Sequence, residues 1–244
     1  MGKVNITQIK DYYAKLQSGI GSSFWIPKGG VNLIRVLPPK DEGLFFYEVR
    51  IHYLPNDFPI KCPRQDNEPC PICELVDNLR KSESAEDVDR SRRLSAKKRY
   101  LMNVIDLDDI EAGVQIFPAG REVLRQLLTY FVDPDWGDLT DPDKGYDIVI
   151  EKAGSGLQTS YTVRPRKNST PIPDKSLLEK VGDLSAVFPK LTREEVTQKL
   201  ISIQADVSTP VDAPDMSGAK STGTSVKNIT DDEFRRKLEE MMGR

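Results

Sequence analysis

Apolar and polar residues alternate along much of the first two thirds of the chain, a pattern typical of antiparallel β-strands. The clearest run is LFFYEVRIHY at 44–53. Because successive side chains of a strand point to opposite faces, one face would carry Phe45, Tyr47, Val49, Ile51 and Tyr53 and the other Phe46, Glu48, Arg50 and His52. Further strands are predicted at 31–39, 100–106 and 113–117, and YDIVIEK and LQTSYTVR, joined by AGSG at 153–156, predict a hairpin.

Helical periodicity marks a smaller part of the chain. Residues 118–131 place Val123, Leu124, Leu127, Leu128 and Phe131 on one face. Thr192 and Glu195 have the spacing of a capping box, which predicts a helix over 192–201. Several antiparallel strands, with one helix before the closing hairpin, predict a mainly β fold with helices (α+β), namely an OB-fold-like Greek-key barrel.

Composition divides the rest of the chain. We expect an N-terminal segment at 1–23, with a short helix over 1–19, a barrel core at 24–166 that contains an insertion at about 52–99, and a helical extension at 167–202. Residues 203–229 are rich in Ser, Thr, Pro, Gly and Asp, which predicts a disordered linker. Residues 230–244 form a tail with a short amphipathic helix, on which Phe234, Leu238 and Met241 share a stripe.

Charge and hydropathy set limits on partners and location. The 35 Lys and Arg residues nearly balance the 38 Asp and Glu residues, so the chain is not a uniformly basic nucleic-acid binder, although its first half is mildly basic. No stretch has the apolar length of a signal peptide core or a membrane span. We therefore expect a soluble protein of a reducing compartment, where an odd number of cysteines favours metal binding over disulfides.

The only histidine and all three cysteines lie within residues 52–73. The pattern His52-x9-Cys62-x7-Cys70-x2-Cys73 offers one imidazole and three thiols, the ligands of a tetrahedral zinc ion. Four protein ligands leave no open position for water, so one structural zinc ion is predicted. The alternative, a strand histidine with three buried thiols, gives no packing reason for the clustering, and an imidazole in an isolated loop suits zinc better than iron–sulfur.

Several motifs resemble one known family. They are His52, Cys62-Pro63, Cys70-Pro71-Ile72-Cys73-Glu74, the charged helix that follows, and YLMNVID at 100–106. FWIPKGGVNLIRVLP at 24–38 and FPAGREVLRQL at 117–127 add weaker likeness. Over roughly residues 24–166 the chain resembles the zinc-containing single-stranded DNA-binding (helix-destabilising) proteins of T4-type bacteriophages.

The resemblance implies a function and a set of partners. It implies an OB-fold core with a zinc subdomain that coats single-stranded DNA during phage replication, recombination and repair, in the cytoplasm of the infected bacterial host. It also implies a basic N-terminal segment for self-association and an acidic tail for contacts with replication proteins. Here residues 1–19 hold only Lys3, Lys10 and Lys15 as bases, and the last 32 residues balance six basic against six acidic groups. We therefore expect at most weak or moderate self-association, and possible protein partners only through the C-terminal tail.

Binding of single strands needs cations for phosphates and aromatic faces for bases. Aromatic and basic residues are interleaved in this chain, and we expect the following to contact DNA: Trp25, Arg35, Tyr47, Arg50, Tyr53, Arg64, Lys97, Lys98, Arg99, Tyr100, Tyr161 and Arg164. On alternating strands about half of such aromatic residues should face the core instead. The basic run at 90–99 would ordinarily be the solvated face of a helix.

Two other functions fit parts of the sequence. A magnesium-dependent nuclease would use Asp106, Asp108 and Asp109, or Asp133 and Asp135. Aspartates beside Gly and Pro are more often turn residues, and the ligand set leaves no histidine or thiol to act as base or nucleophile, so we expect no enzyme. A zinc-stapled protein-interaction adaptor of the replication or transcription machinery would use residues 230–242 as its docking helix.

Overall fold

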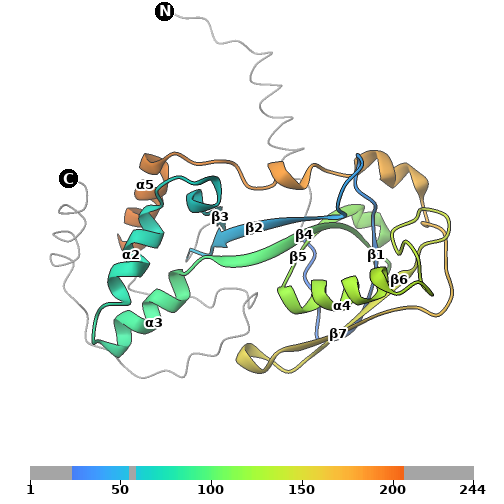
Figure 1. Cartoon of the computed structure of the whole chain (residues 1–244), viewed down its shortest axis with the longest axis horizontal. Helices are drawn as coiled ribbons and strands as arrows, with labels where there is room; N and C mark the ends of the chain where they lie inside the picture. Colours follow the sequence, from blue (N-terminus) through green and yellow to red (C-terminus); the bar gives the residue numbers. More distant parts are fainter. Residues whose placement is uncertain (1–23, 55–58, 206–244) are drawn as a thin grey trace, which may run out of the picture.

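Strands form the centre of the fold, helices α2 (Pro71–Leu79), α3 (Ala85–Leu94) and α5 (Arg193–Ala205) gather at one end of it, and α4 (Arg121–Val132) lies against the strands (Figure 1). The computed structural model describes residues 24–54 and 59–205. The predictions for residues 1–23, for 206–229 and for the tail at 230–244 lie outside the described residues. Within the described part, the strands are β1 (Gly30–Val36), β2 (Phe46–His52), β3 (Ile60–Lys61), β4 (Lys97–Asp106), β5 (Val114–Ala119), β6 (Asp147–Ala153) and β7 (Ser160–Pro165).

The α-helices interrupt this strand order at two places, and α5 follows the last strand. Short 3₁₀ helices are η1 (Pro63–Asp66), η2 (Ile110–Ala112), η3 (Gly156–Gln158), η4 (Lys175–Lys180) and η5 (Leu184–Ala186). Among the described residues, no helix is long and apolar enough to cross a membrane.

Strand β4 pairs with three other strands, β1, β2 and β5. All strand ladders are antiparallel, in the order β3-β2-β4-β1-β6-β7, and β5 pairs with β4 off this path. One edge of β4 pairs first with β2, from Lys97 to Met102, and then with β1, from Val104 to Asp106. The predicted α+β class is confirmed, with an antiparallel sheet and an inserted subdomain that contains the cysteines.

Both faces of β4 are buried, which explains its continuous apolar run. Tyr100, Met102 and Val104 pack in the largest core cluster, together with residues of α4. Leu101 and Ile105 point the other way and pack with two smaller clusters. These clusters are completed by residues 172–188, which carry η4 and η5 across the second face of the sheet.

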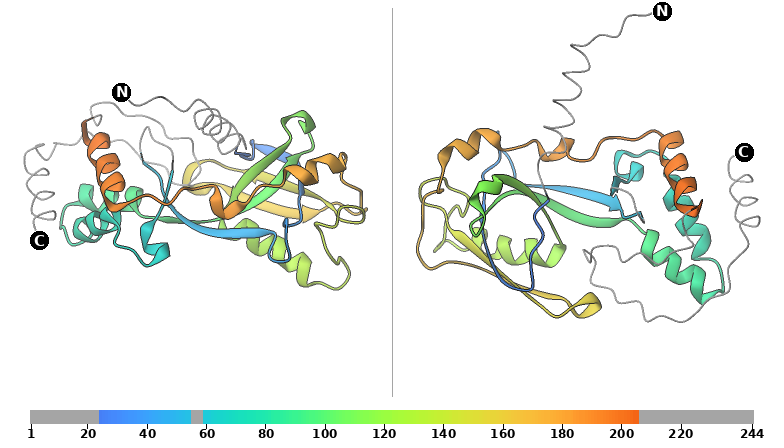
Figure 2. Two further views of the ribbon diagram at one scale, coloured as in Figure 1. Left: turned by 90° about the horizontal axis from the view of Figure 1, so that it is seen from above. Right: turned by 180° about the vertical axis from the view of Figure 1, so that it is seen from behind.

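The helical extension predicted at 167–202 consists of two parts with different structures. Residues 167–192 contain the 3₁₀ turns η4 and η5, and only α5 is an α-helix. The predicted capping box at its start is confirmed: the Thr192 amide donates to Glu195 Oε2 at 2.8 Å, and the Glu195 amide donates to Thr192 Oγ1 at 3.2 Å. Helix α5 then lies beside α2 at the far end of the molecule from β6 and β7 (Figure 2).

Helix α4 is tied to the outer edge of β7 by one side chain. Gln126 Nε2 donates to the Tyr161 carbonyl at 2.8 Å, and Gln126 Oε1 accepts from the Val163 amide at 2.8 Å. The amide group of Gln126 thus bonds the strand as a neighbouring peptide would. It fixes the helix against the hairpin and satisfies two edge groups of β7.

A buried arginine fastens the loop between α4 and β6. The Arg35 side chain, which is fully buried, donates to Asp147 Oδ1 at 3.3 Å, to the carbonyl of Asp141 at 2.8 Å and to the carbonyl of Thr170 at 2.7 Å. A Cβ atom added at Gly145 would lie 2.7 Å from the guanidinium group, so glycine is needed there. Arg35 therefore holds together segments that are distant in the sequence.

Replacing Arg35 by methionine tests this role. Arg35→Met would fill the space but leave the Asp147 carboxylate and two carbonyls without their donor, so we expect a loss of about 3–5 kcal/mol in the free energy of unfolding, measured by urea denaturation. Arg125→Met, which removes an exposed ion pair with Glu122, is the control and should change stability little. Equal stability of the two variants would contradict the role given to Arg35.

Candidate metal centre and nucleic-acid interface

Local backbone structure places the four predicted ligands. His52 is the last residue of β2. Cys62 and Cys70 occupy equivalent positions, because each is the N-cap residue of a helix whose first residue is proline, η1 and α2 respectively. Cys73 lies in the first turn of α2. Since the N-terminus of a helix carries partial positive charge, both Cys70 and Cys73 lie where a thiolate is favoured.

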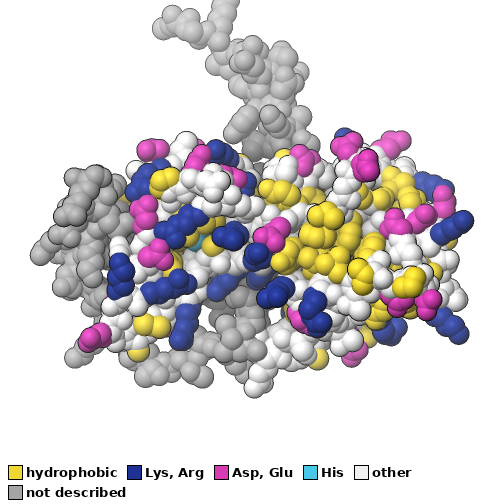
Figure 3. Space-filling model, viewed as in Figure 1, with side chains coloured by type: hydrophobic (Ala, Val, Ile, Leu, Met, Phe, Trp, Pro, Cys, Tyr) yellow, Lys and Arg dark blue, Asp and Glu magenta, His cyan; other side chains and the backbone are white. Residues whose placement is uncertain are grey.

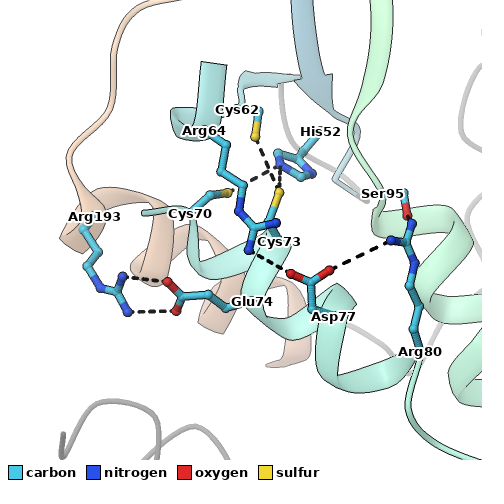
Figure 4. A network of polar contacts seen from close by, with 10 residues as sticks. All are labelled: His52, Cys62, Arg64, Cys70, Cys73, Glu74, Asp77, Arg80, Ser95 and Arg193. Atoms are coloured by element: carbon cyan, nitrogen blue, oxygen red, sulfur yellow. Dashed lines mark hydrogen bonds and ion pairs between the residues drawn. The ribbon is translucent and has the colours of Figure 1, made fainter. Parts of the chain in front are cut away.

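The four ligand atoms form one group (Figure 4). Cys62 Sγ and Cys73 Sγ lie 3.5 Å apart, and His52 Nε2 lies 3.5 Å from Cys70 Sγ and 3.6 Å from Cys73 Sγ. All four atoms lie within 4.8 Å of one another, and the three cysteines are free thiols. Tetrahedral zinc with ordinary bond lengths predicts ligand separations of about 3.5–3.8 Å. The donor set and its spacing therefore fit one zinc ion.

The orientation of His52 is set by its other ring nitrogen. Nδ1 lies 2.7 Å from the carbonyl oxygen of Leu94, the last residue of α3. A carbonyl only accepts, so Nδ1 carries a proton, and Nε2 is the nitrogen that faces the sulfur atoms and can bind a metal. Burial lowers the pKa of His52, but contacts with Cys62, Cys70 and this carbonyl outweigh burial and raise the pKa to about 9. A metal ion bound among the sulfur atoms would displace a proton from Nε2, while Nδ1 would keep its proton and its bond to Leu94.

The subdomain around these ligands has its own small core, which α5 completes. Its buried residues come from three parts of the chain: Leu54, Ile60, Cys62, Cys70, Ile72, Leu75, Val76, Leu79, Leu94, Val196 and Leu200. Arg193 of α5 also forms a two-bond ion pair with Glu74 of α2, with both distances at 2.9 Å (Figure 4). The subdomain is thus larger than the predicted range of 52–99, because α5 seals it from more than a hundred residues away in the sequence.

A cleft of about 350 Å³ opens directly beside the metal ligands. Its lining includes Cys62 and Cys73 together with four cations, Arg50, Arg64, Arg80 and Lys98. Figure 3 shows Lys and Arg side chains gathered over this end of the molecule and continuing toward an apolar patch on the same face. The cleft therefore places four cationic side chains directly beside two of the potential metal ligands.

Beyond the cleft, one face of β2 and β4 continues from Arg50 and Lys98 toward Phe46. The cross-strand pairs Arg50–Lys98, Glu48–Tyr100 and Phe46–Met102 follow one another along this face. The Phe46 ring packs against Phe45, which in turn stacks on Phe131 of α4 at 4.5 Å between centroids. Phe46 and Phe131 are half-buried, while their chain neighbours Leu44 and Val132 are 68% and 79% exposed. The surface thus changes along the strands from basic to apolar and aromatic.

The structure brings together three of the cations predicted to bind DNA. Arg50, Arg64 and Lys98 line the cleft. Arg50 comes from β2, Lys98 from β4 and Arg64 from η1. Gln65 holds η1 against β2, because its side chain accepts from the Arg50 amide at 2.6 Å and donates to the Glu48 carbonyl at 2.9 Å.

Three other predicted contacts are corrected by the structure. Trp25 is 4% exposed, packs edge-on against Phe117 and donates to Asp106. Arg35 is enclosed in the ion pair described above. Tyr100 is 8% exposed and lies in the main core cluster, where it contacts Phe46. None of the three side chains presents a free surface to a base or phosphate, so their predicted contact with DNA was wrong, and Tyr100 supports Phe46 instead.

The remaining predicted contacts lie away from the cleft. Tyr47 and Tyr53 pack against the core cluster on the opposite face of β2. Arg99 donates to Tyr53 Oη at 3.2 Å, and Lys97 donates to the Arg92 carbonyl at 2.9 Å. The last two residues predicted as contacts lie on β7: Tyr161 is half-buried and Arg164 is exposed. Strand alternation separates Tyr47, Lys97 and Arg99 from Arg50 and Lys98, whereas β7 lies at the opposite end of the sheet from β2.

Sequence reasoning missed three side chains of this surface. Arg80, the C-cap residue of α2, lines the cleft. Phe46 has the same side-chain direction as Arg50, and this alternation was the available signal for it. Phe131 was predicted as an inward residue of a helix, and nothing local to it shows that α4 ends beside β2.

The aspartates considered for a nuclease serve as hydrogen-bond acceptors in local structure. Asp106 accepts from Trp25 Nε1 at 3.0 Å and from the Asp108 amide at 3.0 Å. Asp133 accepts from the Asp135 amide at 3.0 Å. Within residues 24–54 and 59–205, the only group of three or more potential metal ligands is the one formed by His52 and the cysteines.

Comparison with known proteins identifies the family. The family model described as "gp32 DNA binding protein like" matches residues 28–205. The chain belongs to this gp32-like family. No curated protein matches the chain.

Family membership confirms the resemblance to the T4-type single-stranded DNA-binding proteins and supports single-stranded DNA binding in general. The matched region ends with α5, beyond the range of 24–166 over which motifs are visible. In this gp32-like chain the His52, Cys62, Cys70 and Cys73 cluster can hold the zinc ion expected of the family. With three thiolates around a divalent ion, the bound cluster would carry one net negative charge among the arginines of the cleft.

Loss of one ligand tests the zinc site. Cys70→Ser replaces a fully buried thiolate by a poor zinc ligand, so the purified gp32-like variant should contain much less than one zinc ion per chain by atomic emission. Glu68→Gln, in the same loop but without a ligand atom, should keep a full complement. Equal zinc content in the two variants would overturn the ligand assignment.

Removal of zinc by a chelator tests the enlarged subdomain. Because Val196 and Leu200 pack on the core around the ligands, we expect hydrogen exchange to accelerate in α5 as well as in α2 and α3. Strands β1 and β6, which pair with each other in the main sheet, should keep their protection. Unchanged exchange in α5 beside faster exchange in α2 would show that α5 is independent of the metal.

Proposed function

We propose that this chain binds single-stranded DNA along the cleft and the adjoining face of β2 and β4. The observation that supports this proposal best is the order of side chains on that face, from the cations Arg50 and Lys98 to the aromatic Phe46. Cations neutralise phosphates, and aromatic rings stack on bases, which is the combination that sequence-tolerant binding of single strands requires.

Charge distribution supports single strands over duplexes as the target. The stacking surface is of use only to bases with a free face, and a duplex hides these faces between neighbouring base pairs. The net charge of −3 means that the surface outside the cleft has no general excess of cations, which disfavours loose adhesion to a duplex. The proposed biological role is to coat and protect exposed single strands during phage DNA replication, recombination and repair.

Other parts of the proposal rest on the family alone. The family is one of DNA-binding proteins without catalytic activity, and the proposed location is the cytoplasm of the infected bacterium. Replication or recombination proteins are proposed partners of the tail at 230–244, and weak or moderate self-association is proposed for the whole chain. The tail lies outside the described residues.

Two substitutions on the proposed surface separate its two kinds of contact. Phe46→Ala should weaken binding of a fluorescent oligo(dT) by about 1–3 kcal/mol without changing its salt dependence. Arg50→Gln should weaken binding and reduce the slope of log K against log salt by about 0.7 for one lost phosphate contact. Anisotropy at several salt concentrations measures both, and it does not depend on the buried Trp25.

The same titration needs two controls. Lys175→Gln removes a cation of η4, which covers the opposite face of the sheet, and should bind like the wild type. RNA and duplex of equal length, measured with zinc content on the same sample, define the preferred nucleic acid. Wild-type protein with full zinc and no binding to oligo(dT) at low salt would overturn the proposed function.

A further inference from the structure

The cations of the cleft are not equally available to a ligand. Arg64 Nη2 lies 2.8 Å from Asp77 Oδ2, and Arg80 Nη1 lies 3.9 Å from Asp77 Oδ1. Lys98 Nζ lies 2.8 Å from Glu48 Oε1. Among the described residues, Arg50 is the one lining cation with no side-chain ion pair, so three of the four positive charges face a carboxylate of the protein itself.

Asp77 occupies a special place among these acids. It lies on α2, lines the cleft and directs one carboxylate oxygen to each of two guanidinium groups (Figure 4). A backbone phosphate also offers two oxygens with one shared negative charge, and arginine binds both kinds of oxyanion in the same way. Arg80 is fixed from its far side as well, because it donates to Ser95 Oγ at 2.9 Å.

Partial exposure makes the arrangement exchangeable. Arg64, Asp77 and Arg80 side chains are 43%, 44% and 58% exposed, so no member is locked in the interior. Ion pairs at this level of exposure contribute little stability. A strand that brings a phosphate to the cleft can therefore replace the carboxylate at small cost to the fold.

We propose that Asp77 is an internal substitute for a DNA phosphate. Its carboxylate holds Arg64 and Arg80 in position while the cleft is free, competes with the incoming backbone, and so limits affinity and salt dependence. Glu48 acts on Lys98 in the same way from β2. The inference rests on the proposed binding of single-stranded DNA and assigns these two acids the role of setting its strength.

Neutralising Asp77 tests the proposal directly. Asp77→Asn should raise affinity for oligo(dT) about three- to tenfold and steepen the salt slope by about 0.7, because one more phosphate is effectively neutralised. Asp89→Asn is the matched control, since it changes the net charge equally but frees Arg93 on α3, outside the cleft lining. This control should bind like the wild type.

A second pair of variants links the effect to its mechanism. Glu48→Gln, on the main sheet rather than in the cysteine subdomain, should also raise affinity and steepen the slope. In an Arg64→Gln background, Asp77→Asn should gain much less than in the wild type, because the competing pair is already broken. Zinc content and the thermal midpoint confirm that each variant is folded.

The outcomes separate this inference from the function on which it rests. Wild-type protein that fails to bind oligo(dT) refutes the proposed function. Wild-type binding with Asp77→Asn equal to Asp89→Asn, or with affinity lowered in a folded, zinc-loaded Asp77→Asn variant, refutes the role of Asp77 alone. A gain of the same size in the Arg64→Gln background would also refute it, because the gain would then not depend on the competing pair.

Discussion

The cleft and the subdomain beside it depend on one convergence, that of an imidazole and three thiols on a single point. The segment between β2 and β4 contains the two-residue strand β3 and short helices, and it has a small apolar core. A metal ion bound by the four ligands would therefore supply much of what holds it in place. His52 carries the constraint into the main sheet, because it ends β2 and also bonds the last carbonyl of α3. The positions of Arg64 and Arg80 follow from that same constraint, since both extend from elements that begin or end beside the ligands.

The same ligands also fix the backbone of the two helices that carry Arg64 and Arg80. Phosphate-binding arginines lose less entropy when their backbone is fixed in advance, and η1 and α2 are fixed by the ligands at their first residues. The aromatic end of the surface is held differently, by packing between β2 and α4. The cations and the aromatic rings of the proposed surface thus come from two units that share β2 and β4, and continuous strands rather than a hinge set the relative position of the two.

Local signals were enough to predict the cluster of potential metal ligands and the described strands other than the short β3. The spacing of His52, Cys62, Cys70 and Cys73 and the alternation along β2 are properties of short segments, and the structure keeps both. Burial was harder to predict. Trp25, Arg35 and Tyr100 have the residue types of a DNA-binding surface, but their exposure depends on partners far away in sequence, such as Asp147 for Arg35. The docking of α5 on the cysteine subdomain is likewise a long-range contact that no local pattern encodes.

The bonds between Gln126 and the edge of β7 have a consequence if many copies bind side by side on one strand, as proposed. Molecules crowded along one polymer hold their strand edges close together, and open edges invite intermolecular sheet growth. By occupying the amide of Val163 and the carbonyl of Tyr161, Gln126 removes two adjacent pairing points from that edge. A single neutral side chain thereby blocks two positions at which this edge could pair with a strand of another molecule.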